Sequence, residues 1–359
     1  MKKICFVLLS VVGISFCGQS KVLTVSNNTN SPGQYTDLQA ACDAASDYDT
    51  IYIHASETYY SAVNIKKPLV LIGEGALPNQ QVLWGTTVSS ITFTYDIGSD
   101  LPSSGSRVYG INASFTIGTD KSNTNKGISG IVFERCKGWI YSNPGVNITG
   151  LSIHQFNGGI QLQGALVNSI ISNSILHNVK WGLYSSNNII RNCILSSYSQ
   201  FYGAVVANNI FYDPNTGSTL NFFSAENTTF TNNVCYFSTN PFPLQNVNNV
   251  TYTGNIVDKN PKFVQSATAG DVNGYVAFTA PPFANFNLLV GSPALTLGTD
   301  GTQAGIYGGP TPWVDGGEGV YRYFAMPSQV PYVTDMDILN TAIPLNGTLN
   351  VKIKAKTQQ

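Results

Sequence analysis

Short apolar segments recur along the middle of the chain, and each follows a Gly or an Asn. The members are Gly130-Ile131-Val132-Phe133, Gly150-Leu151-Ser152-Ile153, Asn173-Ser174-Ile175-Leu176, Asn192-Cys193-Ile194-Leu195, Asn208-Asn209-Ile210-Phe211, Asn232-Asn233-Val234-Cys235 and Gly254-Asn255-Ile256-Val257. The shortest step runs from 192 to 208, which is 16 residues, and the longest from 208 to 232, which is 24 residues. A solenoid tolerates such drift, because each coil keeps its strands and varies its loops.

The residue types at these positions favour stacked parallel strands. Gly and Asn accept left-handed backbone geometry and so turn the chain between strands. Steps this short leave little room for a crossover helix, which disfavours a βαβ arrangement. We expect the Asn amides to bond up and down the stack, so that turn groups are not buried without partners.

A second motif follows part of a coil later. Its members are Gly138-Trp139-Ile140-Tyr141, Gly159-Ile160-Gln161-Leu162, Gly182-Leu183-Tyr184 and Gly203-Ala204-Val205. One full coil then reads Asn168-Ser169-Ile170, Asn173-Ser174-Ile175, Asn178 and Gly182-Leu183. This rhythm resembles the right-handed parallel β-helix repeat family of the pectin-lyase-like superfamily over residues 125–265. The resemblance implies an all-β, right-handed parallel β-helix.

The N-terminal part is similar to the same superfamily. Residues 35–46 have helical periodicity, with Leu38, Ala41, Cys42 and Ala45 on one face. Residues 49–53 and 67–73 follow as apolar strands, an opening shared by pectinesterase-like proteins. The resemblance implies that the helix caps the first coil, whose strand edges and core would otherwise be exposed.

The chain divides into three predicted parts. Residues 1–20 read as an export signal, with Lys2 and Lys3 before a short apolar stretch, and predict secretion or a cell-surface location. Cys17 leaves lipidation open. Residues 21–310 form the β-helix with its N-terminal cap, and residues 311–359 form an extended tail that ends in one strand. The tail resembles those of exported proteins of the Bacteroidota.

The composition argues against several classes of partner. Charged residues make up 10% of the chain and the net charge is -1, which argues against a nucleic-acid partner. No later stretch is apolar for the roughly 18 residues that a membrane helix needs. The cysteines beyond the signal lie far apart, without a CxxC pair, so we expect buried thiols and no zinc site; a disulfide among them is left open. These are Cys42, Cys136, Cys193 and Cys235.

The sequence lacks the catalytic motifs that enzymes of the pectin-lyase-like superfamily usually carry. Acidic residues between 126 and 258 are too scattered for the carboxylate cluster of a calcium-dependent pectate lyase. No adjacent Asp-Asp pair supports glycoside hydrolysis, and the motifs of polygalacturonases and pectinesterases are missing. We therefore predict no metal and no cofactor.

Two groups of residues are candidates for a site. His154 and His177 both lie four residues after an anchor, which places them on successive coils. They would form either a solvated face, the interpretation we favour, or a stripe that contacts sugar or transfers a proton. His177, Lys180, Trp181, Tyr184 and Arg191 could bind an acidic sugar by stacking and charge pairing, although Trp181 could instead pack on its own coil.

Two functions remain open from sequence. The first is a non-catalytic polysaccharide-binding or surface-binding protein, with His154, His177, Lys180, Trp181 and Tyr184 as ligand contacts. The second is a calcium-independent polysaccharide lyase or related carbohydrate-active enzyme, with His177 as the candidate base. Fold alone does not decide between them.

Overall fold

The computed structural model describes most of the chain between residues 20 and 356. The described ranges are 20–29, 31–74, 85–94, 103–118, 127–195, 199–213, 223–237, 248–265, 285–313, 332–338 and 351–356. The proposed export signal, including Cys17, lies outside them except for Ser20.

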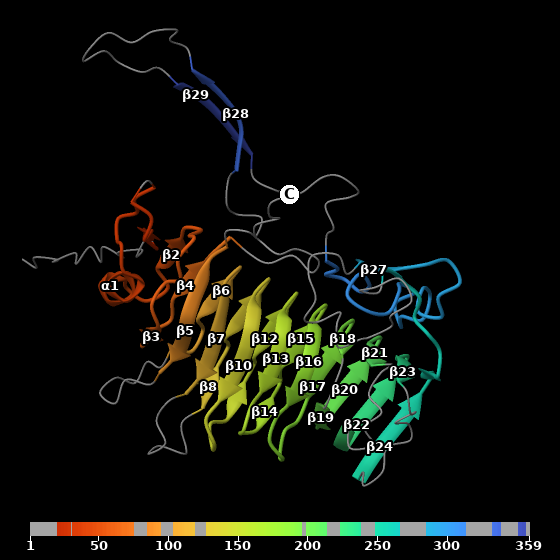
Figure 1. Cartoon of the computed structure of the whole chain (residues 1–359). Coiled ribbons are helices and arrows are strands. Elements are labelled where there is room, and N and C mark those ends of the chain that lie inside the picture. The colour runs from red at the N-terminus through yellow and green to blue at the C-terminus, as the bar shows by residue number, and fades with distance from the viewer. Residues whose placement is uncertain are drawn as a thin grey trace, which may run out of the picture.

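Parallel strands stack coil upon coil into an elongated solenoid (Figure 1). The first ladder of strands runs the length of the molecule. It contains β1 (Val22–Val25), β2 (Thr50–Ile53), β4 (Val70–Ile72), β6 (Arg107–Tyr109), β9 (Val132–Glu134), β12 (Ser152–His154), β15 (Ile170–Ser172), β17 (Asn188–Arg191), β20 (Ala204–Ala207), β22 (Phe223–Thr231) and β24 (Asn248–Thr253).

A second ladder forms another side of the coil. It contains β3 (Val63–Ile65), β5 (Thr87–Phe93), β7 (Asn112–Ile117), β10 (Lys137–Ser142), β13 (Asn157–Gln161) and β16 (Ile175–Lys180). Beyond β16 it divides. One branch is β18 (Ile194–Leu195), β21 (Ile210–Asp213), β23 (Val234–Phe237) and β25 (Ile256–Val257), and the other is β19 (Ser199–Tyr202), which pairs with the start of β22.

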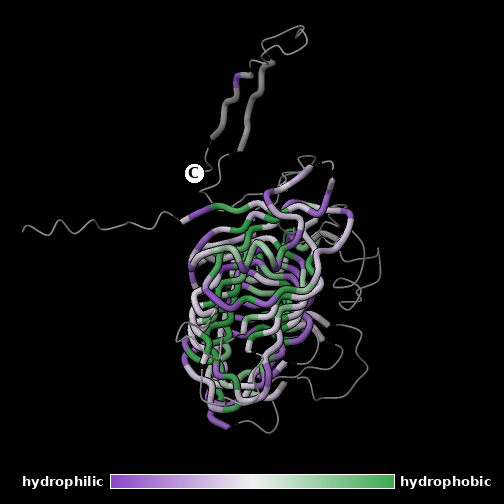
Figure 2. The backbone as a smooth tube through the Cα atoms, turned by 90° about the vertical axis from the view of Figure 1, so that its left-hand side faces the viewer, coloured by the Kyte–Doolittle hydropathy of each residue, from purple (hydrophilic) through white to green (hydrophobic). Residues whose placement is uncertain are grey.

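A short third sheet closes the early coils. It contains β8 (Ile128–Ser129), β11 (Ile148–Thr149) and β14 (Leu166–Val167). Seen from the N-terminal end, the coils lie one behind another (Figure 2). The predicted all-β parallel β-helix is confirmed.

Two columns of left-handed residues turn each coil. One contains Arg135, Gln155, Asn173, Asn192, Asn208, Asn232 and Gly254, and the other contains Gly130, Gly150, Asn168, Asn187, Gly203, Asn227 and Asn249. The series found in the sequence mixes members of these two columns. Gly and Asn occur in both columns, and an apolar segment follows each turn, so the sequence pattern does not separate them. The real coil step after Gly150 leads to Asn168, whose neighbouring carbonyl of Val167 accepts from the Gly150 amide.

The asparagine ladder is real but lies one residue further along than predicted. Asn233 is fully buried and accepts at Oδ1 from both the backbone amide and the side-chain amide of Asn209, at 2.9 and 3.0 Å. It donates in turn to Asn255 Oδ1 at 2.8 Å and to the Val206 carbonyl at 2.9 Å. This ladder satisfies the turn groups between the first and second ladders of strands.

In the second column, left-handed asparagines bond to one another, as Asn187 does to Asn168 and Asn249 to Asn227, but those of the first column bind a late segment instead. We call residues 292–313 the C-terminal strap. Asn232 donates to the Leu297 carbonyl, Asn208 to Thr299 Oγ1, and Asn173 to the Ile306 carbonyl. The strap therefore runs back along the coils, opposite to the direction in which they stack.

The strap extends slightly past the predicted end of the β-helix at 310. Trp313 is buried at its end, and its indole nitrogen donates to the backbone carbonyl of Asn173. Gln155 donates to the Pro312 carbonyl at 3.0 Å. Between the coils and the strap, β26 (Phe263–Gln265) pairs antiparallel with β27 (Asn285–Leu288).

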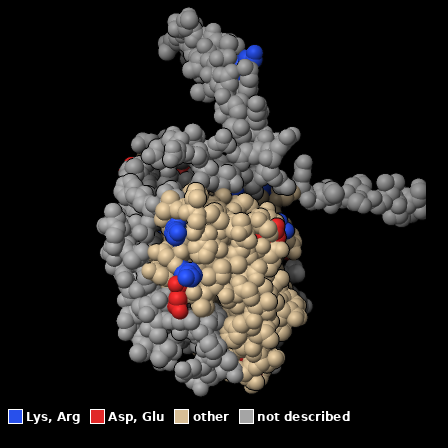
Figure 3. All heavy atoms as spheres, turned by 90° about the vertical axis from the view of Figure 1, so that its right-hand side faces the viewer, with Lys and Arg blue, Asp and Glu red and all other residues tan. Residues whose placement is uncertain are grey.

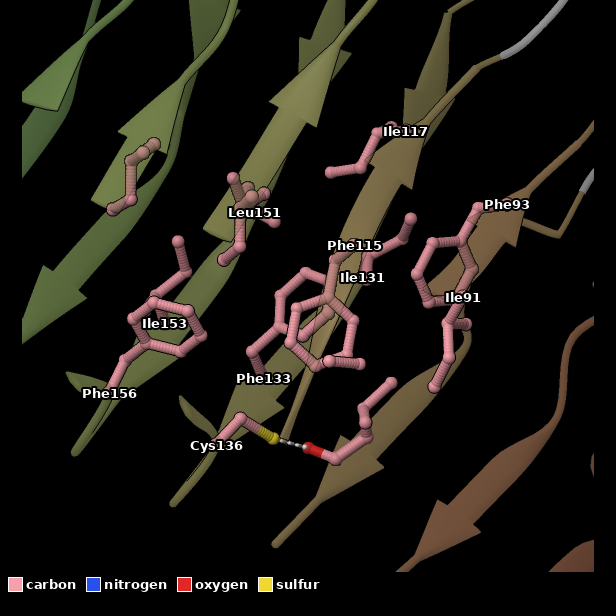
Figure 4. Packing of buried hydrophobic residues seen from close by; sticks show 14 of the residues in the cluster. Ile91, Phe93, Phe115, Ile117, Ile131, Phe133, Cys136, Leu151, Ile153 and Phe156 are labelled. Carbon is pink, nitrogen blue, oxygen red and sulfur yellow. Dashed lines mark hydrogen bonds between the residues drawn. The ribbon is translucent and has the colours of Figure 1, made fainter. Parts of the chain in front are cut away.

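The solenoid interior is a continuous apolar stack. Phe133 makes edge-to-face contacts with Phe93 and Phe115, with ring centroids 5.8 and 4.9 Å apart (Figure 4). Complete burial of each such ring contributes about 1.5–3 kcal/mol of transfer free energy. Inward apolar positions therefore add to the hydrogen bonds that hold successive coils together.

The four cysteines within the described residues are buried and free, so no disulfide joins them. Cys136 Sγ lies 3.5 Å from the Val108 carbonyl (Figure 4). Burial raises the pKa of the Cys42, Cys136 and Cys193 thiols to about 12. Their behaviour as small hydrophobic residues is confirmed.

The predicted cap is present at the N-terminal end. Helix α1 (Leu38–Ala44) begins after Asp37, whose carboxylate accepts from the Ala40 amide at 2.7 Å. Its buried face is Leu38, Ala41 and Cys42, as the periodicity predicted. No helix in the described ranges is long and apolar enough to span a membrane.

Beyond Trp313, the described residues of the predicted tail form an antiparallel pair of strands. Strand β29 (Val351–Lys356) coincides with the predicted strand, and it pairs antiparallel with β28 (Tyr332–Ile338). The sequence did not predict β28, because the surrounding prolines indicated an irregular segment.

Candidate functional site

The two histidines do not form the predicted stripe. His154 lies on β12 in the first ladder, where its register partners are Glu134 and Ser172. His177 lies on β16 in the second ladder. The prediction of neighbouring histidines on successive coils is therefore wrong. It failed because Gly150 and Asn173 belong to different turn columns, so the same offset from each leads to a different strand.

His177 instead contacts an aromatic residue that the sequence reading did not select. Its ring meets the edge of Trp139 from β10, with centroids 4.8 Å apart and planes at 83°. Strand β13 lies between β10 and β16, and its Gly159 is in register with Trp139 on one side and with Asn178, the neighbour of His177, on the other. A Cβ at Gly159 would overlap the Trp139 ring, so the missing side chain lets the indole lie across to the coil of His177.

Trp139 also pairs with a residue on its own strand. The Tyr141 ring lies nearly parallel to the indole, at 7°, with centroids 5.7 Å apart. Both side chains are half-buried, whereas Ile140 between them points into the core. The alternation in Trp139-Ile140-Tyr141 carries this signal, because strand residues two apart share a face.

Polar side chains continue this face onto the next two coils. Gln161 of β13 and Lys180 of β16 are in register with Tyr141, and Asn178 is in register with Gly159. We call Trp139, Tyr141, Gln161, His177 and Lys180 the aromatic face. It combines two ring surfaces with an amide, an imidazole and an ammonium group.

The remaining predicted contacts lie elsewhere. Trp181 is 1% exposed, its indole nitrogen donates to the Tyr202 carbonyl at 2.9 Å, and its ring meets Phe201 in the core. This supports the packing interpretation and leaves no ring face for a ligand. Tyr184 is 93% exposed on the following turn. Arg191 belongs to the first ladder, in register with Ser172.

Neither a family model nor a curated sequence matches the chain. Solved structures similar to it include two crystal structures of the pectin methylesterase from Aspergillus niger, one with an N-acetylglucosamine stub and one deglycosylated. Each is 14% identical and covers 72% of this chain and 95% of its own, with TM-scores of 0.33 and 0.28. Such values assign neither family nor activity.

Burial sets the protonation of the aromatic face. It lowers the pKa of His177 below its ordinary value of 6.5, so the imidazole is neutral at pH 7. It raises the pKa of Tyr141, so the phenol stays protonated. The face therefore holds a neutral base and a proton donor, in addition to its ring surfaces.

The described strands β7, β10, β13 and β16 contain no Asp or Glu, but they contain Lys137 and Lys180. Within the described ranges no three His, Cys, Asp or Glu side chains are grouped to hold a metal ion. At the end of the solenoid that faces the viewer in Figure 3, most of the surface drawn for the described residues is uncharged, with separate groups of Lys or Arg and of Asp or Glu. The aromatic face is thus weakly cationic.

Proposed function

We propose that this chain is an exported or cell-surface protein that binds an acidic polysaccharide on its aromatic face. The parallel pair of Trp139 and Tyr141 carries the proposal, because carbohydrate rings bind to aromatic faces through their C–H groups and apolar area. Binding requires no chemical step.

The surrounding groups support a sugar ligand. Gln161 supplies a donor and an acceptor for hydroxyl groups, and Lys180 supplies a cation for a carboxylate or sulfate. Strands about 4.8 Å apart place these groups in a row along the solenoid axis. A linear polysaccharide that runs along this axis meets Tyr141, Gln161 and Lys180 on three successive coils.

The preference for an acidic chain follows from charge. Lys137 and Lys180 are the charged residues of the described strands β7, β10, β13 and β16, and both are positive. Attraction between exposed charges is screened by salt. We therefore expect binding of alginate or pectate to weaken at high ionic strength, and binding of a neutral glucan to be weaker throughout.

Calorimetry with alginate, pectate and a neutral glucan tests this function. Trp139→Ala should lower affinity at least about tenfold, the effect of losing one binding hot spot. Tyr184→Ala is the matched control, because it removes an exposed aromatic ring from a turn outside the aromatic face. Equal affinities for wild type and Trp139→Ala, with the fold intact, would reject the aromatic face as the binding site.

The second candidate function is a calcium-independent polysaccharide lyase. Neutral His177 and protonated Tyr141 on one face favour it, because a lyase needs a base to remove a sugar proton and an acid for the leaving oxygen. Incubation with pectin, alginate and chondroitin, followed by absorbance of unsaturated ends, distinguishes the two. If the wild type releases unsaturated products and His177→Gln does not, the lyase function would be supported and the purely binding function rejected.

A further inference from the structure

A second polar cluster lies on the first ladder, away from the aromatic face. Both ring nitrogens of His154 are engaged by serines. Nε2 lies 3.1 Å from Ser152 Oγ on the same strand, and Nδ1 lies 2.6 Å from Ser172 Oγ on the next coil. A neutral imidazole donates a hydrogen bond through one nitrogen and accepts one through the other. One of the two serine hydroxyls therefore donates a hydrogen bond to the ring, and the other accepts one.

The burial of the two serines differs and sets their roles. Ser172 is fully buried, so no substrate can reach it, whereas Ser152 is half-buried on the outer surface of β12. If Nδ1–H donates to Ser172, Nε2 accepts from the Ser152 hydroxyl. That arrangement is a nucleophile, a base and a group that orients the base.

The surroundings of Ser152 suit a small apolar group. Its register partners on the adjacent coils are Val132 and Ile170, both partly exposed. Together they form an apolar strip on either side of the hydroxyl. A short acyl chain fits such a strip better than a charged or bulky group.

Burial and the charge of Arg191 keep the His154 ring neutral. Glu134 faces it from β9, and Arg191 lies in the same column beyond Ser172, on β17. Arg135 follows Glu134 but bonds to Gln155 at 2.8 Å. Burial, and then the charge of Arg191, lower the pKa of His154 below 6.5.

We propose that Ser152 and His154 form a hydrolytic site for short-chain acyl esters, such as acetylated sugar hydroxyls, with Ser172 as the residue that positions the imidazole. This site is independent of the aromatic face, because it lies on a different ladder of strands. It adds removal of acyl groups to polysaccharide binding.

The reaction balances within these residues and water. Ser152 Oγ forms a bond to the ester carbonyl carbon while its proton moves to His154 Nε2. The carbonyl carbon then releases the alcohol oxygen, which takes that proton. Water, deprotonated by His154, cleaves the acyl-serine, so that the carboxylic acid leaves and Ser152 regains its proton. Arg191 supplies positive charge on this side of the sheet.

Hydrolysis of p-nitrophenyl acetate by the full chain tests the proposal. Wild type should release p-nitrophenolate above the buffer rate, and Ser152→Ala and His154→Gln should each lower that excess about 100-fold. A fluorophosphonate probe should label Ser152, located by mass spectrometry of the peptide. Ser186→Ala and His54→Gln are matched controls, which remove a serine and a histidine from other strands or turns and should keep the wild-type rate.

The role of Ser172 has its own readout. The rate should fall as pH drops through the His154 pKa, which lies below 6.5, because the protonated imidazole cannot act as a base. Ser172→Ala removes an acceptor that stabilises the protonated ring, so the midpoint should move to lower pH. An unchanged midpoint would reject the positioning role.

Circular dichroism should show that each variant keeps the wild-type strand content. Absence of hydrolysis and of probe labelling in wild type would overturn the proposal, as would a wild-type rate in Ser152→Ala. Either result leaves the glycan titration of Trp139→Ala unaffected, so failure here is distinguishable from failure of the binding function.

Discussion

Trp139 and Tyr141 hold their rings nearly parallel on the outside of β10, with planes 7° apart and centroids 5.7 Å apart. This pair exists because β10 alternates between core and surface and because Gly159 leaves room on the next coil. A strand normally fills the surface of its neighbour with side chains. Here one missing side chain lets an indole cross a coil and reach His177.

Gly159→Ala should weaken glycan binding without unfolding the protein. A new Cβ would overlap the Trp139 ring, and the ring would have to move. Tryptophan fluorescence and calorimetry would report the displacement and the lost affinity. In a Trp139→Ala background the same change should have no further effect on binding, because the clash is gone. An equal loss of affinity in both backgrounds would contradict the role assigned to Gly159.

Asn233→Leu should lower the free energy of unfolding by about 1–3 kcal/mol for each buried group left without a partner. The Asn233 side chain serves the Asn209 amide and the Val206 carbonyl inside the turn. Asn248→Ala, at an exposed position on β24, is the control and should change stability little. Urea denaturation followed by circular dichroism measures both, and equal effects would show that the ladder contributes no stability.

Trp313→Ala should loosen the C-terminal strap. The indole is 4% exposed and donates to the backbone of Asn173, so its removal leaves a cavity and a lost hydrogen bond. Large-to-small changes of this kind cost about 3–5 kcal/mol. Limited proteolysis should cut the variant within 292–313 at protease levels that leave the wild type intact. Identical cleavage of the two proteins would argue against a strap that holds the coils.

Stability should fall in alkaline solution because of the buried thiols. Burial raises the pKa of Cys136 to about 12 from an ordinary value of 9.0, so above pH 9 the unfolded state loses a proton that the folded state keeps. The folded state is therefore favoured fully below pH 9 and progressively less between pH 9 and 12. Urea denaturation at pH 8 and pH 10.5 should show a larger drop for wild type than for Cys136→Ala, which lacks this thiol. A drop of the same size in both would refute the assignment.

The sequence was sufficient for the solenoid because the relevant forces are local and repeated. Apolar residues that alternate with Gly and Asn predict short strands joined by tight turns, and the apolar face of Leu38, Ala41 and Cys42 predicts the capping helix. Each coil needs only its neighbours to bury its inward face. The burial of Cys193 and Cys235 was predicted from their apolar neighbours, whereas the sequence left a disulfide open and the structure shows free thiols.

The register between coils could not be read from the sequence. Arg135 and Gln155 occupy left-handed turn positions where Gly or Asn is usual. The sequence pattern therefore missed these turns and aligned Gly150 with Asn173, which belongs to the other column. That slip placed His154 beside His177 rather than beside Ser172. Hydrogen bonds between neighbouring coils decide register, and several alignments of an irregular repeat satisfy the apolar pattern equally well.

The sequence by itself determined a β-helix with a capping helix and buried cysteines, because the spacing and type of the residues decide which side chains are buried. Only the tertiary structure decided which surface residues meet. It placed Trp181 in the core, brought Trp139 across Gly159 to His177, and joined the Asn173 turn to Trp313, 140 residues later. Such contacts depend on how coils of unequal length superimpose, a property of the whole stack that no single segment encodes.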